Sequence, residues 1–202
     1  MLVGTNNMGK LTELRRLLGE ADVELVTLRE AGVREEVEED GLTFLANAQK
    51  KAREYALASG LATLADDSGL VVRALAGRPG VESANYGGPG LTATERNQLL
   101  LRELDGTADR RAEYVCVIAL ARPGGPAASV FMGRCEGRIG RHPVGESGFG
   151  YDPVFVLPDG RSMAEVSPAD KDVLSHRGRA VAELLAQFDL ARFAQLERTS
   201  DG

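Results

Sequence analysis

Two adjacent aspartates, Asp66 and Asp67, precede Ser68 and Gly69 and follow a short apolar run over residues 61–65. The run predicts a strand, which would deliver the acidic pair to the edge of a sheet, where open α/β sheets bind their ligands. Neighbouring carboxylates repel each other, so they persist where a cation or a catalytic task holds them. A plain aspartate-rich turn that caps the strand is the alternative.

A second polar segment, Thr5-Asn6-Asn7-Met8-Gly9-Lys10, lies between an apolar run and an amphipathic stretch. Backbone N–H groups at the start of a helix attract phosphate oxygens, and Gly9 allows a close approach of the backbone. Lys10 adds a cation that can reach a polyphosphate. The glycine spacing differs from that of a P-loop, and a capped turn with a solvated lysine is the alternative.

The acidic stretch at residues 35–40, EEVEED, could supply a magnesium ligand, although such runs are usually solvated faces. Magnesium in proteins takes one or two carboxylates together with substrate phosphates and water. Asp67 with Glu38 or Glu39 would satisfy that requirement. The spacing does not decide which glutamate serves.

Two further segments carry groups that suit a purine nucleotide. In the loop Phe149-Gly150-Tyr151-Asp152 the aromatic rings could stack on a base and the carboxylate could bond its edge, or the loop could simply anchor a turn. Lys171, His176 and Arg177 follow within seven positions. Arginine suits bidentate contacts and lysine a phosphate charge, which favours an anionic or purine ligand. No nucleophile motif is present.

The elements that must position these residues are strands near both ends of the chain, with helices between them. Period and turn signals predict strands at residues 1–5, 23–28, 61–65 and 154–157, a hairpin of 112–122 with 128–136, and helices that begin near Leu11, Thr43, Thr92 and Ser167. Val181, Leu184, Leu185 and Phe188 would form the apolar face of the last helix. We expect a mixed α/β sheet with flanking helices and two lobes around a cleft.

Composition limits the function classes. The 202 residues fit one domain, taken as 1–198 with a frayed tail at 199–202, and the net charge of −6 argues against a nucleic-acid partner. No apolar run reaches the ~20 residues of a membrane helix, and we see no secretory signal. A cytoplasmic protein is expected, with Cys116 and Cys135 as buried free thiols.

The chain resembles the inosine triphosphate pyrophosphatase family, also called the dITP/XTP pyrophosphatases. The resemblance rests on the ordered segments TNNMGK, GLTFLANAQKKA, ADDSGL, LAGRPGVESANY, GFGYDPVF and SHRGRA and extends from residue 3 to about 190. It implies an elongated mixed sheet, a homodimer, a magnesium requirement and hydrolysis of ITP, dITP and XTP to the monophosphate and pyrophosphate. A Maf-like enzyme acting on pyrimidine or modified nucleotides is the alternative.

The resemblance also implies roles for individual residues. Residues 5–10 would hold the triphosphate, Asp67 would be the general base and a metal ligand with Glu38 or Glu39, and Ser68 would contact the substrate. The base and sugar would lie against Phe149, Gly150, Tyr151, Asp152, Lys171, His176 and Arg177. The chain departs from the family where Asn6 replaces a common glycine, Ala46 a glutamate and Asn85 an arginine.

Overall fold

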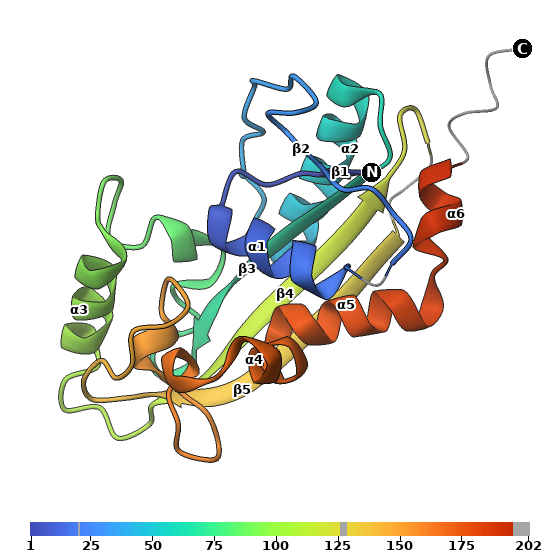
Figure 1. Ribbon diagram of the computed structural model, residues 1–202. Helices are drawn as coiled ribbons and strands as arrows, with labels where there is room; N and C mark the ends of the chain where they lie inside the picture. Colours follow the sequence, from blue (N-terminus) through green and yellow to red (C-terminus); the bar gives the residue numbers. More distant parts are fainter. Residues whose placement is uncertain (20, 126–128, 196–202) are drawn as a thin grey trace, which may run out of the picture. The chain divides into compact units, whose positions relative to one another are not determined.

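The computed structural model describes residues 1–19, 21–125 and 129–195. The strands are β1 Leu2–Val3, β2 Val26–Thr27, β3 Thr63–Val72, β4 Arg111–Ala121, β5 Ser129–Ile139 and β6 Phe155–Val156. The helices are α1 Met8–Leu17, α2 Phe44–Ser59, α3 Ala93–Glu103, α4 Pro168–Leu174, α5 His176–Gln187 and α6 Leu190–Gln195, with short 3₁₀ turns at Arg73–Leu75, Gly80–Ala84, Asp152–Val154 and Met163–Glu165. In Figure 1 strands and α-helices alternate from β1 to β4, and β5 and β6 are then followed by α4, α5 and α6.

The strands form one mixed sheet in the order β2-β1-β3-β4-β5-β6. The short β1 pairs in parallel with both β2 and β3, whereas β5 and β6 are antiparallel. The neighbours β4 and β5 form the predicted hairpin, because the connection from Ala121 to Ser129 is too short for a parallel crossover. The predicted mixed α/β fold is confirmed.

Two strand predictions need correction. Only Val26 and Thr27 of the expected strand at 23–28 pair with the sheet. Conversely, β3 does not stop at Ala65 but continues to Val72, so Asp66 and Asp67 lie within the strand rather than beyond its end. Aspartate is a poor strand former, but the residues that contact Asp66 and Asp67 in the folded chain favour the extended conformation here. These contacts are described below.

The chain divides into two compact units. The first comprises Met1–Asp67, Cys116–Gly133 and the chain from Arg177 onward, and the second comprises Ser68–Val115 and Arg134–His176. The strands β3, β4 and β5 each contribute residues to both units. The expected frayed tail at 199–202 lies outside the described residues.

The first unit has helices on both faces of its strands (Figure 1). Alternate strand residues point to opposite faces, and the apolar clusters follow that rule. One cluster joins α1 and α5 to Leu64 of β3 and Ile118 of β4, while a second joins the alanines of α2 to Ala65 and Val117. Within α5, Val181 and Leu184 are buried as predicted, but Leu185 is 41% exposed, contrary to the predicted apolar face.

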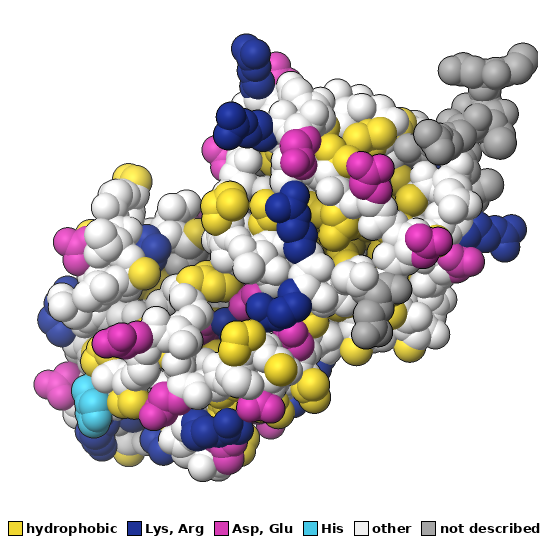
Figure 2. All heavy atoms as spheres, in the orientation of Figure 1, with side chains coloured by type: hydrophobic (Ala, Val, Ile, Leu, Met, Phe, Trp, Pro, Cys, Tyr) yellow, Lys and Arg dark blue, Asp and Glu magenta, His cyan; other side chains and the backbone are white. Residues whose placement is uncertain are grey.

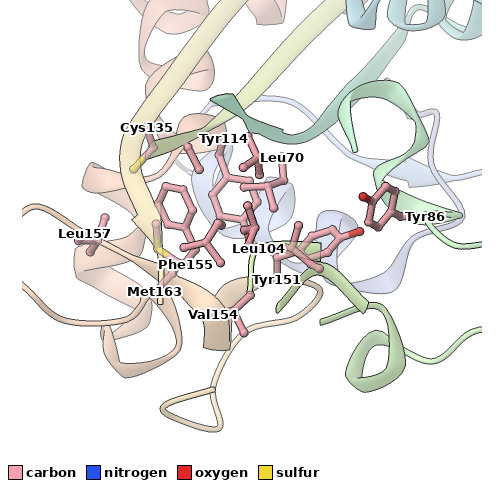
Figure 3. Close-up of a cluster of buried hydrophobic side chains, with 14 of the residues drawn as sticks. Leu70, Tyr86, Leu104, Tyr114, Cys135, Tyr151, Val154, Phe155, Leu157 and Met163 are labelled. Atoms are coloured by element: carbon pink, nitrogen blue, oxygen red, sulfur yellow. The ribbon is translucent and has the colours of Figure 1, made fainter. Parts of the chain in front are cut away.

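The second unit has its own core, drawn in Figure 3. Leu70, Leu104, Tyr114, Tyr151 and Phe155 come from five separate elements or turns and pack together there. The rings of Tyr114 and Phe155 lie 4.4 Å apart. Through Tyr151, this core therefore anchors the loop at 149–152, which contains four of the predicted base-binding residues.

The helix starts follow the local sequence closely. Thr43 caps α2 through the N–H of Ala46, Thr92 forms a complete capping box with Glu95 at α3, and Ser167 caps α4. Both cysteines are buried and free, as predicted. Among the described residues, every helix is too short or too polar to cross a bilayer. Basic and acidic side chains are interspersed over the face in Figure 2.

Candidate active site

The two aspartates of β3 enter different surroundings because they are adjacent in a strand. Asp66 shares its face with Leu64, which packs on α1 and α5, and Asp67 shares its face with Ala65, which packs on α2. Both carboxylates are almost completely buried, with 0% of Asp66 and 4% of Asp67 exposed. The strand thus places one acid between α1 and α5 and the other beside α2.

Asp66 is held by cations. Its Oδ2 lies 3.2 Å from Nζ of Lys10 and 3.3 Å from Nη2 of Arg177, whose guanidinium also pairs with the Glu13 carboxylate of α1. Burial by itself would raise the pKa of Asp66, but Lys10, Arg177 and Lys51 together hold it well below its ordinary value. Asp66 therefore stays ionised and serves as a fixed negative charge.

Asp67 has the opposite shift. Burial raises its pKa to about 6, against the lowering influence of Lys51, Lys10 and a hydrogen bond from Asn47, while Glu39 raises it further. The Nδ2 of Asn47 donates to Asp67 Oδ2 at 3.0 Å. A carboxylate with a pKa near neutrality is suited to accept a proton from water.

The loop of residues 5–10 follows the short β1, beside the part of β3 that carries the acidic pair. Gly4 N–H bonds Leu64 O, and the Lys10 side chain then reaches Asp66. Its geometry differs from expectation, because the N–H groups of Gly9 and Lys10 already donate to Oδ1 of Asn7, at 3.0 and 3.1 Å. The Lys10 ammonium, rather than these two amides, is thus the clearest candidate in the loop for a contact with phosphate.

Other residues of the loop support its turn. Thr5 Oγ1 accepts from the Asn7 N–H at 3.2 Å, and the exposed Met8 begins α1. Among the described residues, Ala76 is the single non-glycine with positive φ, so Asn6, which stands where the family commonly has a glycine, does not occupy the left-handed region. Asn6 is therefore an unstrained, exposed member of the turn.

The acidic stretch brings Glu39 to Asp67. Nζ of Lys51 lies 3.0 Å from Oε2 of Glu39 and 3.9 Å from Oδ1 of Asp67, so the two carboxylates share one ammonium. Glu38 instead lies in the electrostatic neighbourhood of the adjacent Lys50. Burial would lower the pKa of Lys51, but Asp66, Asp67 and Glu39 produce a net rise, which keeps it protonated.

Three side chains of this cluster were not predicted from the sequence: Glu13, Asn47 and Lys51. All are buried polar residues on helices whose other buried residues are mostly apolar. Asn47 and Lys51 are four positions apart on α2 and so share one face. That spacing, together with the presence of Lys51 among alanines at 48, 52 and 56, is the signal that could have identified Asn47 and Lys51.

The second unit groups most of the predicted base-binding residues. The Asp152 carboxylate accepts from Lys171 Nζ at 2.6 Å, from the Phe149 N–H at 2.9 Å and from the Tyr114 hydroxyl at 3.2 Å. Lys171 lies 5.0 Å from the centre of the Phe149 ring. The Tyr114 ring stacks on His176 at 4.6 Å.

The remaining residues of that prediction have separate positions. The Tyr151 ring belongs to the core, and its hydroxyl donates to Ser83 O at 2.9 Å. Gly150 accepts at its carbonyl from Nδ2 of Asn97, at 3.1 Å. Ser68 is half-buried at the start of the second unit. Arg177 belongs by its contacts to Asp66 and Glu13 in the first unit.

The cluster around the acidic pair fits a divalent cation. Asp67 and Glu39 offer two hard oxygen ligands at one place, which is the number that magnesium commonly takes from protein when substrate phosphates and water complete its shell. In the described part of the chain, no group of three or more potential ligands gathers. Negative groups outnumber positive ones in the cluster, in which the described charges are Glu13, Glu39, Asp66 and Asp67 against Lys10, Lys51 and Arg177.

Comparison with known proteins identifies the family. The family model for the Ham1 family matches residues 1–187. The chain is 45% identical over 202 residues to a dITP/XTP pyrophosphatase of Syntrophobacter fumaroxidans, covering 100% of this chain and 87% of the relative. A protein of the same name from Nitrosomonas europaea is 46% identical, covering 92% of each chain. The structure of a HAM1 protein from Coxiella burnetii aligns with a TM-score of 0.84 at 41% identity, covering 92% of this chain and 95% of that chain. The family model covers most of the chain and the relatives match along nearly its whole length, so the chain belongs to the Ham1 family.

Proposed function

We propose that this protein hydrolyses deaminated purine nucleoside triphosphates, ITP, dITP and XTP, to the nucleoside monophosphate and pyrophosphate. The observation that carries the proposal is the ion pair of Lys10 with Asp66, the residue next to Asp67 on β3, because this cation also acts electrostatically on the Asp67 carboxyl. The dITP/XTP pyrophosphatase relatives support the substrate class.

Asp67 is the general base of the proposed reaction. It orients or deprotonates a water that attacks the α-phosphorus, and the bond to the bridging oxygen breaks so that pyrophosphate leaves. Its pKa of about 6 makes the carboxylate available at neutral pH and a better proton acceptor than an ordinary aspartate. Lys10 and Lys51 stabilise the negative charge that develops on the departing group.

Magnesium is the proposed cofactor, with Asp67 and Glu39 as its protein ligands. When bound, it would neutralise phosphate charge and align the triphosphate. Glu38 is the alternative ligand. Replacing each glutamate by glutamine and measuring Mn²⁺ binding by calorimetry separates the two: E39Q should lose affinity and E38Q should retain it.

The base is recognised by the loop of residues 149–152 together with Lys171 and His176. A donor offered to O6 accepts a 6-oxo purine and rejects adenine, which presents its own donor there, at a cost of about 1–3 kcal/mol for each unsatisfied buried group. Asp152 fixes the position of Lys171 and of the Phe149 amide. Arg177 is proposed to hold Asp66 instead of reading the base, because its contacts are with Asp66 and Glu13.

A panel of nucleoside triphosphates tests the proposal. With magnesium present, ITP, dITP and XTP should yield pyrophosphate and monophosphate much faster than ATP, GTP, TTP or UTP. Phosphate and pyrophosphate are measured separately. Release of orthophosphate, or a preference for TTP or UTP, would instead support a Maf-like activity.

Assembly and location complete the proposal. We expect a homodimer that acts on free nucleotides in the cytoplasm, without a nucleic-acid or membrane partner. Light scattering at micromolar concentration checks the dimer: a mass near twice 21.5 kDa supports it, and a monomer excludes it.

A further inference from the structure

Asn47 makes one hydrogen bond to each of the two segments that carry the proposed metal ligands. Its Nδ2 donates to Oδ2 of Asp67 at 3.0 Å, and its Oδ1 accepts from the N–H of Gly41 at 2.8 Å. The side chain is 1% exposed. One buried amide on α2 therefore ties the central strand β3 to the end of the acidic segment.

The close contact between Asn47 and Gly41 requires that residue 41 have no side chain. A Cβ at position 41 would lie 2.5 Å from Oδ1 of Asn47 and 2.9 Å from Cβ of Ala46, distances that no side chain tolerates without a shift. The absence of a side chain is thus what lets the acidic segment approach α2 so closely. Glu39 is two residues before this point and contacts Lys51, which lies one turn after Asn47 on α2.

We propose that Asn47, seated against Gly41, is a positioning residue that sets the separation and orientation of the Glu39 and Asp67 carboxylates. It does not touch the substrate. It acts by holding Oδ2 of Asp67 through its Nδ2, with Oδ1 of Asp67 3.9 Å from Nζ of Lys51, and by holding the segment that contains Glu39 against α2 through Gly41. The inference rests on the proposed function, in which these two carboxylates bind the metal.

Two variants break the link from its two ends. Asn47→Ala removes both hydrogen bonds, and Gly41→Ala displaces the segment while Asn47 is retained. Groups that orient metal ligands typically contribute 10- to 100-fold to metal affinity or activity. Both variants should lose at least tenfold in Mn²⁺ affinity of the substrate-free protein, measured by calorimetry, and at least tenfold in kcat with ITP, while KM changes less than threefold.

Thr43→Ala is the matched control. It removes the cap of the same helix, from the N–H of Ala46, and leaves the bonds of Asn47 intact. It should lower stability without changing Mn²⁺ affinity or kcat. The control therefore shows whether destabilising α2 is enough to cause the losses, or whether the Glu39 and Asp67 carboxylates must be displaced. Circular dichroism confirms that each variant is folded.

The outcomes are distinct. If Asn47→Ala and Gly41→Ala bind Mn²⁺ and turn over as Thr43→Ala does, the positioning role is wrong. If the wild-type protein binds no Mn²⁺ and hydrolyses no nucleotide, the proposed function itself fails.

Discussion

At the scale of single residues, the site depends on two aspartates whose pKa values are shifted in opposite directions. Asp66 is surrounded by Lys10 and Arg177 and stays ionised, whereas burial dominates at Asp67 and raises its pKa to about 6. Strand alternation produces the difference, because neighbouring residues face different helices. One aspartate therefore holds cations in place, and its neighbour is left able to exchange a proton.

Asp67→Asn should abolish most turnover without lowering stability. The pKa of Asp67 is raised on folding, so its favourable contribution is complete below the unfolded value of 3.8 and is lost as pH rises through about 6. At pH 7.5 the neutral asparagine should therefore equal or exceed the wild-type free energy of unfolding, and the difference should shrink below pH 6. Urea unfolding in EDTA measures this, and near-native hydrolysis would exclude Asp67 as the base.

Asp66→Asn makes the same chemical change one residue earlier and should have the opposite effect on stability. Its lowered pKa contributes stability above the unfolded value, and that contribution is lost only in strong acid. Asparagine leaves the fully buried Arg177 with only part of its compensating charge, which should cost about 3–5 kcal/mol at pH 7.5. A loss below about 1 kcal/mol would contradict this account of the pair.

At the scale of elements, α2 carries more of the site than its sequence suggested. It presents Asn47 and Lys51 to Asp67, yet its first turn has only the Thr43 cap. The helix α3, in contrast, has a capping box in which Glu95 returns a bond to Thr92. Ala46 stands where the family commonly has a glutamate, so the start of α2 lacks the second hydrogen bond of a capping box and is less stable.

Ala46→Glu should complete a capping box with Thr43. Position 46 is exposed, so the new carboxylate can bond the Thr43 N–H and also meet the positive end of the helix dipole. We expect the free energy of unfolding to rise by up to about 1 kcal/mol, measured by urea titration. Ala46→Gln, which keeps the hydrogen bond without the charge, should give part of the gain, and a loss of stability in both would show that the box does not form.

Local signals account for the elements that were predicted well. The caps at Thr43, Thr92 and Ser167 involve residues within one turn, so the sequence contains them entirely. The continuation of β3 through Asp66 and Asp67 could not be predicted in this way. It depends on cations supplied by Lys10 and Arg177, which are distant in sequence and meet the strand only in the folded chain.

At the scale of the whole molecule, the first unit is assembled from three separate stretches of chain. The pairing of Arg177 with Glu13 spans 164 residues and its bond to Asp66 spans 111. Because Arg177 follows His176 in the sequence, the motif led us to predict both residues in one base pocket. The division into units falls between these two neighbours. Two residues that are adjacent in a motif have neighbouring backbones, but their side chains can point in different directions.

The C-terminal helices should therefore be indispensable to the first unit. A chain that ends at His176 lacks Arg177 and also Ala180, Val181, Leu184 and Leu190, which are buried in the cluster with α1 and β4. Glu13 and Asp66 would be left without their buried cation and Leu14 and Ile118 without their covering layer. Both losses act on α1 and on the neighbouring strands β3 and β4, so we expect this truncated chain to show no cooperative unfolding transition by circular dichroism.

A chain that ends at Gln195 is the matched comparison, because it keeps every element from β1 to α6. It should unfold cooperatively with a midpoint close to that of the full chain. If the chain ending at His176 also unfolds cooperatively and retains the low pKa of Asp66 by NMR titration, then α1 and β3 organise the acidic pair without α5. Lys10 and Lys51 would in that case be the cations that keep Asp66 charged.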